Sequence, residues 1–305
     1  MSSNPPTRAE LSIDAPHFPL FRRVREAIYA LPASFETETL ISGILATDIY
    51  TLNAALGAAI EHQVVETLNA LRSIWDPDDS YRLYRFIRQS QTFPDVLLKS
   101  VQRDLPGAPV LLGIELKGWY LLAKEGMPSF RYQVTPSACA LQDLIVVVPW
   151  ALSNVISGVP KVFDPYVESA RYAAEYRNYH WQYVREAKTA PDIEIAIGAS
   201  PYPMKSDAIC DRPVSDSGSN FGRLARCGIM DDYIAGARRQ PLCGIEAQYW
   251  LQFFRIFQDR AEASAYTRSL DQLKHRIQKL EVGDNPALNQ LGAIIDALRA
   301  LLELM

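Results

Sequence analysis

Apolar residues recur every three or four positions between Leu52 and Leu71, and this is the strongest periodic pattern in the chain. Such spacing is typical of an α-helix. The sequence therefore predicts a helix over 52–71, followed by a turn at Asp76-Pro77-Asp78-Asp79. Weaker signals predict further helices over 21–31, 135–141, 166–188, 245–262, 266–280 and 286–304.

Short apolar runs between these helices predict strands over 93–98, 110–122, 144–148 and 193–197. The first two runs are separated by the turn sequence Asp104-Leu105-Pro106-Gly107, and the run from Leu144 to Val148 is typical of a strand buried on both faces. The order of elements predicts an α/β fold: a mixed central β-sheet flanked by helices, with helical additions at the C-terminus. We expect a helical N-terminal arm over 1–50, a core over 51–200, and a loop with C-terminal helices over 201–305, packed as one compact unit.

Composition narrows the class of protein. The 305 residues are 48% apolar and 22% charged, which is typical of a globular chain. No apolar run reaches the roughly 18 residues of a membrane span, and the first ten residues do not resemble a signal peptide. The four cysteines form no C-x-x-C pair and suggest free thiols. We therefore expect a soluble cytoplasmic protein that does not bind membranes.

Charge and glycine content exclude two further classes. A net charge of −4 argues against a basic nucleic-acid coat protein, although a local basic groove stays possible because the field depends on where charges lie. The isolated glycines Gly126, Gly158 and Gly244 form no phosphate-binding loop, so no nucleotide cofactor is expected.

The candidate chemistry lies between Phe93 and Trp119, where Pro94-Asp95 precedes Glu115-Leu116-Lys117. Residues two apart on a strand share a face, so Glu115 and Lys117 point the same way, and Asp95 can join them if the two strands pair. Carboxylates are hard ligands for Mg²⁺, which binds through one or two of them together with phosphate oxygens. The metal lowers the pKa of a bound water, and the lysine can orient or deprotonate that water. The alternative is a solvated strand face carrying an ion pair, with Asp95 satisfying a turn.

This pattern resembles the PD-(D/E)xK nuclease superfamily, and its surroundings resemble those of a type II restriction endonuclease. The resemblance rests on Pro94-Asp95, Glu115-x-Lys117 and a preceding helix with Gly57-x-x-x-Glu61, and it covers about a third of the chain. It implies that Asp95 and Glu115 bind Mg²⁺, that Lys117 acts on the attacking water, and that Glu61 is an accessory acid. For Glu61, an exposed position on the helix is an equally good interpretation.

A second constellation lies in the polar segment from Pro203 to Arg226. Arginine reads guanine and clamps phosphates, and asparagine can read adenine, so this loop is a candidate for DNA contact. An ordinary surface loop is the alternative. An Arg- and Tyr-rich segment, 171–185, could also stack on nucleic acid, although aromatic residues at helical spacing more often belong to a core. The candidate DNA-binding residues are Lys205, Ser217, Ser219, Asn220, Arg223 and Arg226.

These observations predict a Mg²⁺-dependent, sequence-specific endonuclease that cuts double-stranded DNA and, by resemblance, leaves 5′-phosphate ends. Cutting both strands of a palindrome with one active site per chain implies a homodimer. Two alternatives stay open: a structure-selective repair or junction-resolving nuclease on the same core, and a non-catalytic intracellular binding protein.

Overall fold

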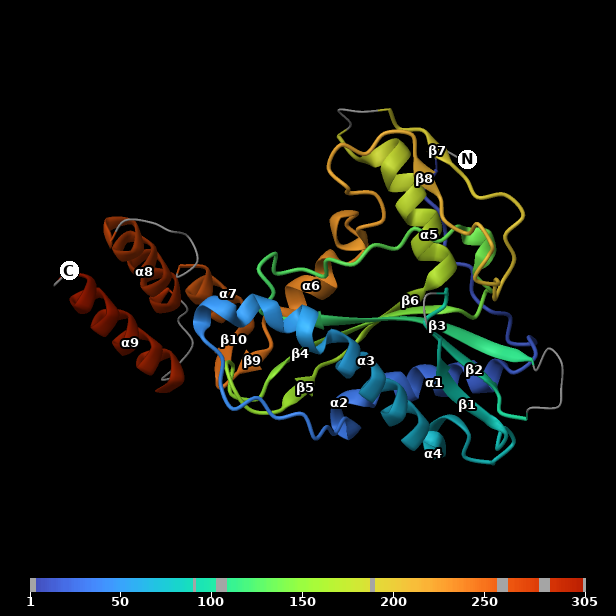
Figure 1. Cartoon of the computed structure of the whole chain (residues 1–305), viewed down its shortest axis with the longest axis horizontal. Coiled ribbons are helices and arrows are strands. Elements are labelled where there is room, and N and C mark those ends of the chain that lie inside the picture. Colours follow the sequence, from blue (N-terminus) through green and yellow to red (C-terminus); the bar gives the residue numbers. More distant parts are fainter. Residues whose placement is uncertain are drawn as a thin grey trace.

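A computed structural model describes residues 4–89, 92–102, 109–186, 190–256, 263–279 and 286–303. Its centre is a six-stranded mixed sheet in the order β1-β2-β3-β4-β5, with β6 also paired to β4 (Figure 1). Only β3 and β4 run parallel, and the other neighbouring strands are antiparallel. The strands are β1 (Tyr84–Arg88), β2 (Val96–Ser100), β3 (Val110–Tyr120), β4 (Leu144–Leu152), β5 (Pro160–Val162) and β6 (Tyr166–Ser169).

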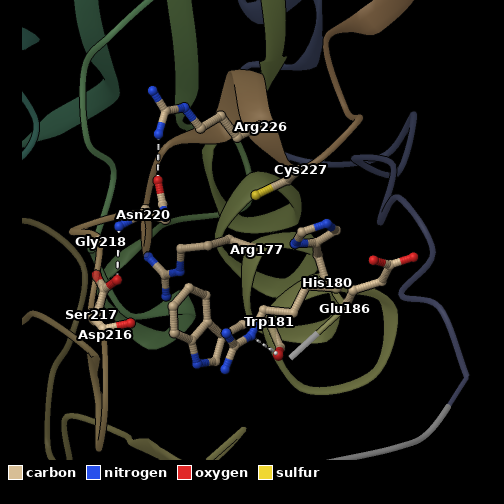
Figure 2. A pocket seen from close by; sticks show the side chains of 12 residues that line it. Arg177, His180, Trp181, Glu186, Asp216, Ser217, Gly218, Asn220, Arg226 and Cys227 are labelled. Atoms are coloured by element: carbon tan, nitrogen blue, oxygen red, sulfur yellow. Dashed lines mark hydrogen bonds between the residues drawn. The ribbon is translucent and has the colours of Figure 1, made fainter. Parts of the chain in front are cut away.

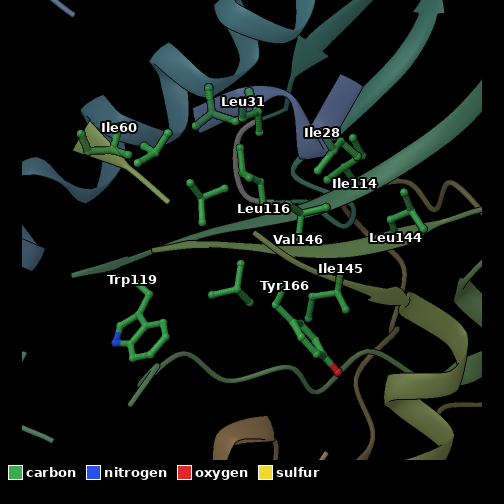
Figure 3. Packing of buried hydrophobic residues seen from close by; sticks show 14 of the residues in the cluster. Ile28, Leu31, Ile60, Ile114, Leu116, Trp119, Leu144, Ile145, Val146 and Tyr166 are labelled. Atoms are coloured by element: carbon green, nitrogen blue, oxygen red, sulfur yellow. The ribbon is translucent and has the colours of Figure 1, made fainter. Parts of the chain in front are cut away.

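Helices cover both faces of this sheet, which explains why its central strands are so apolar. All nine residues of β4 are buried. On one face, Ile114, Leu116 and Val146 lie toward Ile28, Leu31 and Ile60 of the helices (Figure 3). Trp119, Ile145 and Tyr166 lie on the other face. The helices of the first face are α1 (Phe18–Tyr29), α2 (Leu31–Ser34), α3 (Leu52–Ala70) and α4 (Arg72–Trp75), and those of the second are α5 (Ala170–Tyr179) and α6 (Asp231–Ala237).

Most of the expected elements are confirmed. α3 matches the predicted helix over 52–71, and the expected turn follows at Asp76. The C-terminal additions are α7 (Ala247–Ile256), α8 (Ala263–Gln278) and α9 (Pro286–Glu303), which share a small apolar cluster of their own. The fold is therefore α/β, with a mixed sheet, flanking helices and C-terminal helices. No helix among the described residues is long and apolar enough to span a bilayer.

Four expectations of secondary structure were wrong, and β5 and α6 were also not predicted. The segment 166–188 is not one helix: it begins as β6, and Ser169 then caps α5 by accepting a hydrogen bond from the Tyr172 N–H. α5 runs into a π-helical turn over His180–Val184. Of the helix expected over 135–141, only a 3-10 turn over Pro136–Ala138 forms, because Asp143 holds the backbone N–H of Ala140 just beyond it.

The other two errors concern strands. β1 was missed because its pattern, Tyr84 to Arg88, mixes arginines with only one fully buried residue. The run 193–197 yields only a two-residue strand, β7 (Ile193–Glu194), which pairs with β8 (Arg212–Pro213) outside the main sheet. A further pair is β9 (Pro241–Leu242) and β10 (Ile245–Glu246). The expected turn at 104–107 and the ends of several predicted helices lie outside the described residues.

Candidate active site

Asp95, Glu115 and Lys117 meet on one face of the sheet. Antiparallel pairing sets Val96 opposite Ile114, so Asp95, just before β2, lies beside Glu115 on β3. The Lys117 Nζ lies 2.7 Å from Asp95 Oδ2 and 2.9 Å from Glu115 Oε1. Because both oxygens contact the same ammonium, the two carboxylates are neighbours. The predicted pairing of the two strands is confirmed for 96–99, although β2 begins three residues later than predicted, and the three side chains converge as expected.

The cluster lies where β3 loses a strand partner on one side. β2 stops pairing at Val96, and Pro94 has no N–H with which to continue the ladder. The backbone N–H groups of β3 that lack a strand partner donate instead to three side chains. Leu116 N–H donates to Asp95 Oδ2 at 3.2 Å, Gly118 N–H donates to Glu61 Oε1 at 3.1 Å, and Tyr120 N–H donates to Asn53 Oδ1 at 3.2 Å.

The residues of α3 that reach this edge are four apart. Asn53 and Glu61 flank Gly57, so all three share one stripe of the helix. A Cβ on Gly118 would lie 3.7 Å from the Gly57 carbonyl oxygen, which shows how closely α3 approaches β3. Asn53 was missed in the sequence, although its spacing to Gly57 and Glu61 could have indicated it.

Burial controls the charge of the cluster. Glu115 is only 8% exposed. Burial raises the pKa of Glu115 to about 7, an effect that Lys117 opposes and Asp95 reinforces. Burial alone would lower the pKa of Lys117, but the carboxylates of Glu115 and Asp95 outweigh it and hold the pKa above its usual value. Lys117 is therefore an ammonium at neutral pH, and Glu115 changes charge near neutrality. The alternative of a strand face with an ion pair agrees with the structure in its ion pair, but the face is not freely solvated, because Glu115 is buried and Lys117 is partly buried.

Glu61 is partly buried rather than on a freely exposed arc. Besides the Gly118 N–H, its Oε2 lies 3.4 Å from Arg88 Nη2. Burial raises the pKa of Glu61, while the Gly118 N–H, Lys117 and Arg88 act in the opposite direction. The arrangement brings a third acid to the same strand edge as Asp95.

Two carboxylates around one ammonium are a donor set that suits Mg²⁺, which needs only one or two protein carboxylates beside phosphate oxygens and water. The described residues contain no group of three or more His, Cys, Asp or Glu already arranged to hold a metal ion. Lys117 bonds both carboxylates, so an ion that binds them must share or displace the ammonium. Asp95 and Glu115 would be its ligands.

The predicted DNA-binding loop is held together by internal contacts. Arg223 and Arg226 both pair with Glu125, at 3.6 and 3.1 Å, and Arg226 also donates to the Asn220 side chain. The Ser219 carbonyl accepts from Arg223. Ser217, Asn220 and Arg226 line one cavity together with Trp181 of the π-helical turn, whereas Lys205 lies exposed in another part of the segment.

The Arg- and Tyr-rich segment 171–185 belongs partly to the core. Arg177 is buried in an ion pair with Asp211 at 2.6 Å. Tyrosine rings 172, 176, 179 and 183 follow one another along α5 and the π-helical turn, with neighbouring centroids 5.7 to 6.2 Å apart. Only the last of them is exposed.

The fold and the cluster define a class: an α/β protein with a mixed sheet and an acid–lysine cluster at an open strand edge. Neither protein-family models, nor curated proteins, nor solved structures give a match to this chain.

Proposed function

We propose that this protein is a Mg²⁺-dependent endonuclease that hydrolyses phosphodiester bonds of double-stranded DNA at a specific sequence, in the manner of a type II restriction enzyme. The observation that carries the proposal is the Lys117 ammonium bonded to both Asp95 and Glu115. The proposed core is that of the PD-(D/E)xK superfamily, which the same residues resemble in sequence.

The burial of Glu115 supports a catalytic role. A buried carboxylate with a pKa near 7 costs stability, and an apolar residue on this central strand would avoid that cost. Glu115 pairs with Lys117 on the same face of β3, but apolar packing at this position could stabilise the strand equally well. Retention of charge at such a place is typical of functional sites.

Each residue has a role in the proposed reaction. Asp95 and Glu115 would hold the metal, which supplies Lewis acidity and lowers the pKa of water. Lys117, which carries its proton, would donate hydrogen bonds to the scissile phosphate or to the attacking water; its raised pKa disfavours the role of proton acceptor. Glu61 would hold the Gly118 backbone and so position β3. In-line attack by water would leave a 5′-phosphate and a 3′-hydroxyl, and a homodimer would cut both strands.

A non-catalytic role is the second candidate, and one observation favours it. Asp95, Glu61 and Asn53 satisfy three backbone N–H groups that would otherwise lack partners on the open edge of β3. That function needs no chemistry. It explains Glu115 only in part: the Glu115 carboxylate accepts a hydrogen bond from the Asp95 backbone N–H, but that contact does not require a carboxylate buried this deeply beside Lys117.

Digestion of long unmethylated DNA with Mg²⁺ tests the proposal. Wild type should give discrete, reproducible bands, and Lys117→Ala and Asp95→Ala should give none. Lys161→Ala is the matched control, because Lys161 is an exposed lysine on β5 of the same sheet. Circular dichroism should show that all variants fold.

Four results would contradict parts of the proposal. A smear from wild type alone would remove sequence specificity, and cleavage restricted to branched DNA would favour the repair or junction-resolving alternative. No cutting with Mg²⁺ or Mn²⁺ on any substrate would favour the non-catalytic protein. Equal cutting by all variants would mean that the cluster is not the active site.

A further inference from the structure

A cavity of about 440 Å³ lies between the end of α5 and the loop 216–227 (Figure 2). The π-helical turn supplies His180, Trp181 and, just after it, Arg185 and Glu186. A π-helical turn widens the helix by one residue, and such turns are frequent at functional sites. The cavity is lined by residues other than those of the acid–lysine cluster.

Trp181 and Arg185 form a stacked pair in this cavity. The Arg185 guanidinium lies 3.6 Å from the centroid of the Trp181 ring, and its Nε donates to the Trp181 carbonyl oxygen at 2.8 Å. These contacts hold a planar cation in a fixed orientation against an aromatic ring. The Trp181 Nε1 is buried and has no hydrogen-bond partner among the described residues, which leaves a donor unused at this site.

The floor of the cavity is held by an ion pair and hydrogen bonds of Arg177. Arg177 is 1% exposed, pairs with Asp211 and donates to the carbonyl oxygens of Tyr132 and Val134. Its guanidinium lies over Phe221, whose ring meets the edge of Trp181 at 5.2 Å between centroids. Every donor here has a local role, so the floor fixes the shape of the site and does not itself need a ligand.

The rim is polar and comes from the loop. Asn220, Ser217 and Arg226 line it, and Asp216 is turned to its own backbone, where it accepts from the N–H groups of Asn220 and Phe221. These hydrogen bonds keep the pKa of Asp216 below its usual value in spite of its partial burial. The Asp216 charge is thereby used within the loop. The arginines that border the cavity also have partners: Arg226 contacts Asn220 and Glu125, and Arg185 donates from Nη2 to the Ala190 carbonyl oxygen at 3.2 Å, so the cavity offers their charge and the guanidinium plane of Arg185.

We propose that this cavity binds one unstacked nucleotide of the DNA strand, with its base stacked on the Arg185–Trp181 pair and its phosphate charge complemented by Arg185 and Arg226. Bases stack on arginine planes and aromatic rings wherever a nucleotide leaves the helix, and asparagine and serine can hydrogen-bond base edges. The inference rests on the proposed function for its substrate class, and it assigns to the loop 216–226 the capture of an extrahelical or single-stranded nucleotide rather than readout in a groove.

Binding of 2-aminopurine deoxyribonucleoside 5′-monophosphate to the full chain tests this inference. Stacking quenches 2-aminopurine fluorescence, and EDTA in the buffer prevents any cleavage. Wild type should quench the probe in a saturable way. Arg185→Gln, which removes the charge and replaces the guanidinium by a smaller amide, and Arg185→Lys, which keeps the charge but has no planar group, should both bind about 5- to 150-fold more weakly, the factor that corresponds to loss of one stacked base. Lys161→Gln is the control, because it removes one positive charge from a surface away from this cavity.

The variants and the phosphate competition distinguish the possible outcomes. Absence of saturable quenching by wild type overturns the inference. Equal binding by Arg185→Lys and wild type, with displacement by inorganic phosphate alone, shows an anion site without base stacking and also overturns it. If an Arg185 variant does not fold, Arg226→Gln replaces it, with weaker binding expected. Lys117→Ala should bind the probe like wild type. If the wild-type protein binds the probe but does not cleave DNA, the nucleotide pocket is supported and the nuclease proposal fails. If it cleaves DNA but does not bind the probe, the nuclease proposal is supported and the nucleotide pocket fails.

Discussion

Replacement of Lys117 by methionine should destabilise the protein, and the loss should depend on pH. Methionine keeps the length of the side chain and removes its charge and donors. In the wild type the ammonium contacts Asp95 at 2.7 Å and Glu115 at 2.9 Å, and the exposed fractions of the Lys117 and Asp95 side chains are 22% and 27%. The substitution therefore leaves two carboxylates facing each other, one of them buried.

The magnitude follows from the burial of the partners. Loss of one member of a buried ion pair costs about 3 to 5 kcal/mol, and the partial exposure of this cluster places the expected loss near 3 kcal/mol when Glu115 is ionised. In the wild type the pKa of Glu115 is about 7, above its ordinary value of 4.5, because of burial. The folded state thus holds the proton more tightly than the unfolded state, so stability falls as pH rises from about 4.5 through 7. Without Lys117 the pKa of Glu115 should rise further.

Urea denaturation at about pH 5.5 and about pH 8, without divalent cations, measures the effect. At the higher pH the free energy of unfolding of Lys117→Met should be about 3 kcal/mol below that of wild type; at the lower pH, where Glu115 is protonated, the difference should shrink to about 1 kcal/mol. Addition of Glu115→Gln should abolish the pH dependence of this difference. A loss that is the same at both pH values, or that Glu115→Gln leaves pH-dependent, would refute the assignment of the titrating group.

Two further substitutions test the packing around both sites. Gly113→Ala should destabilise the protein by about 1 to 3 kcal/mol in thermal unfolding and impair DNA cleavage, because the new Cβ would lie 2.4 Å from Pro94 Cγ and 2.9 Å from Asp143 Oδ1. Gly57→Ala is the control and should not destabilise the protein, because nothing lies within 4 Å of a Cβ at that position. Arg177→Met should cost about 3 to 5 kcal/mol in urea denaturation because it leaves Asp211 buried and unpaired, and combination with Asp211→Asn should recover part of that loss; full additivity of the two would contradict a direct pairing.

The parts of the fold that were predictable are those in which local pattern and tertiary packing agree. α3 repeats its apolar residues at helical spacing, and the run at Leu144 is apolar throughout because helices cover both faces of the sheet. The convergence of Glu115 and Lys117 follows from the two-residue period of a strand. Asp95 joined them in the prediction only on the condition that its strand paired alongside, which the register confirms.

The parts that failed depend on contacts distant in sequence. Nothing in the segment at Tyr166 marks where a strand ends and a helix begins except Ser169, whose capping bond is visible only in the structure. Arg223 and Arg226 stay candidates for DNA contact, but the sequence could not show that they share Glu125, which lies about a hundred residues earlier. Asn53 acquires its role only because α3 lies along the open edge of β3. Spacing can propose such partners, but only the tertiary fold selects them.

The open edge of β3 links the architecture to the proposed chemistry. A proline just before Asp95 cannot donate to the ladder, so β2 ends there and exposes the N–H groups of β3. Buried donors must be satisfied, and side-chain oxygens accept them, which fixes Asp95 and Glu61 close to Lys117 without a bound ion. The same hydrogen bonds therefore preorganise acids for a cation and explain part of the cluster on structural grounds alone. Glu115 is the residue on which the two interpretations differ most: it accepts from the Asp95 backbone N–H, but its burial is unfavourable for stability, and the proposed function would use its charge.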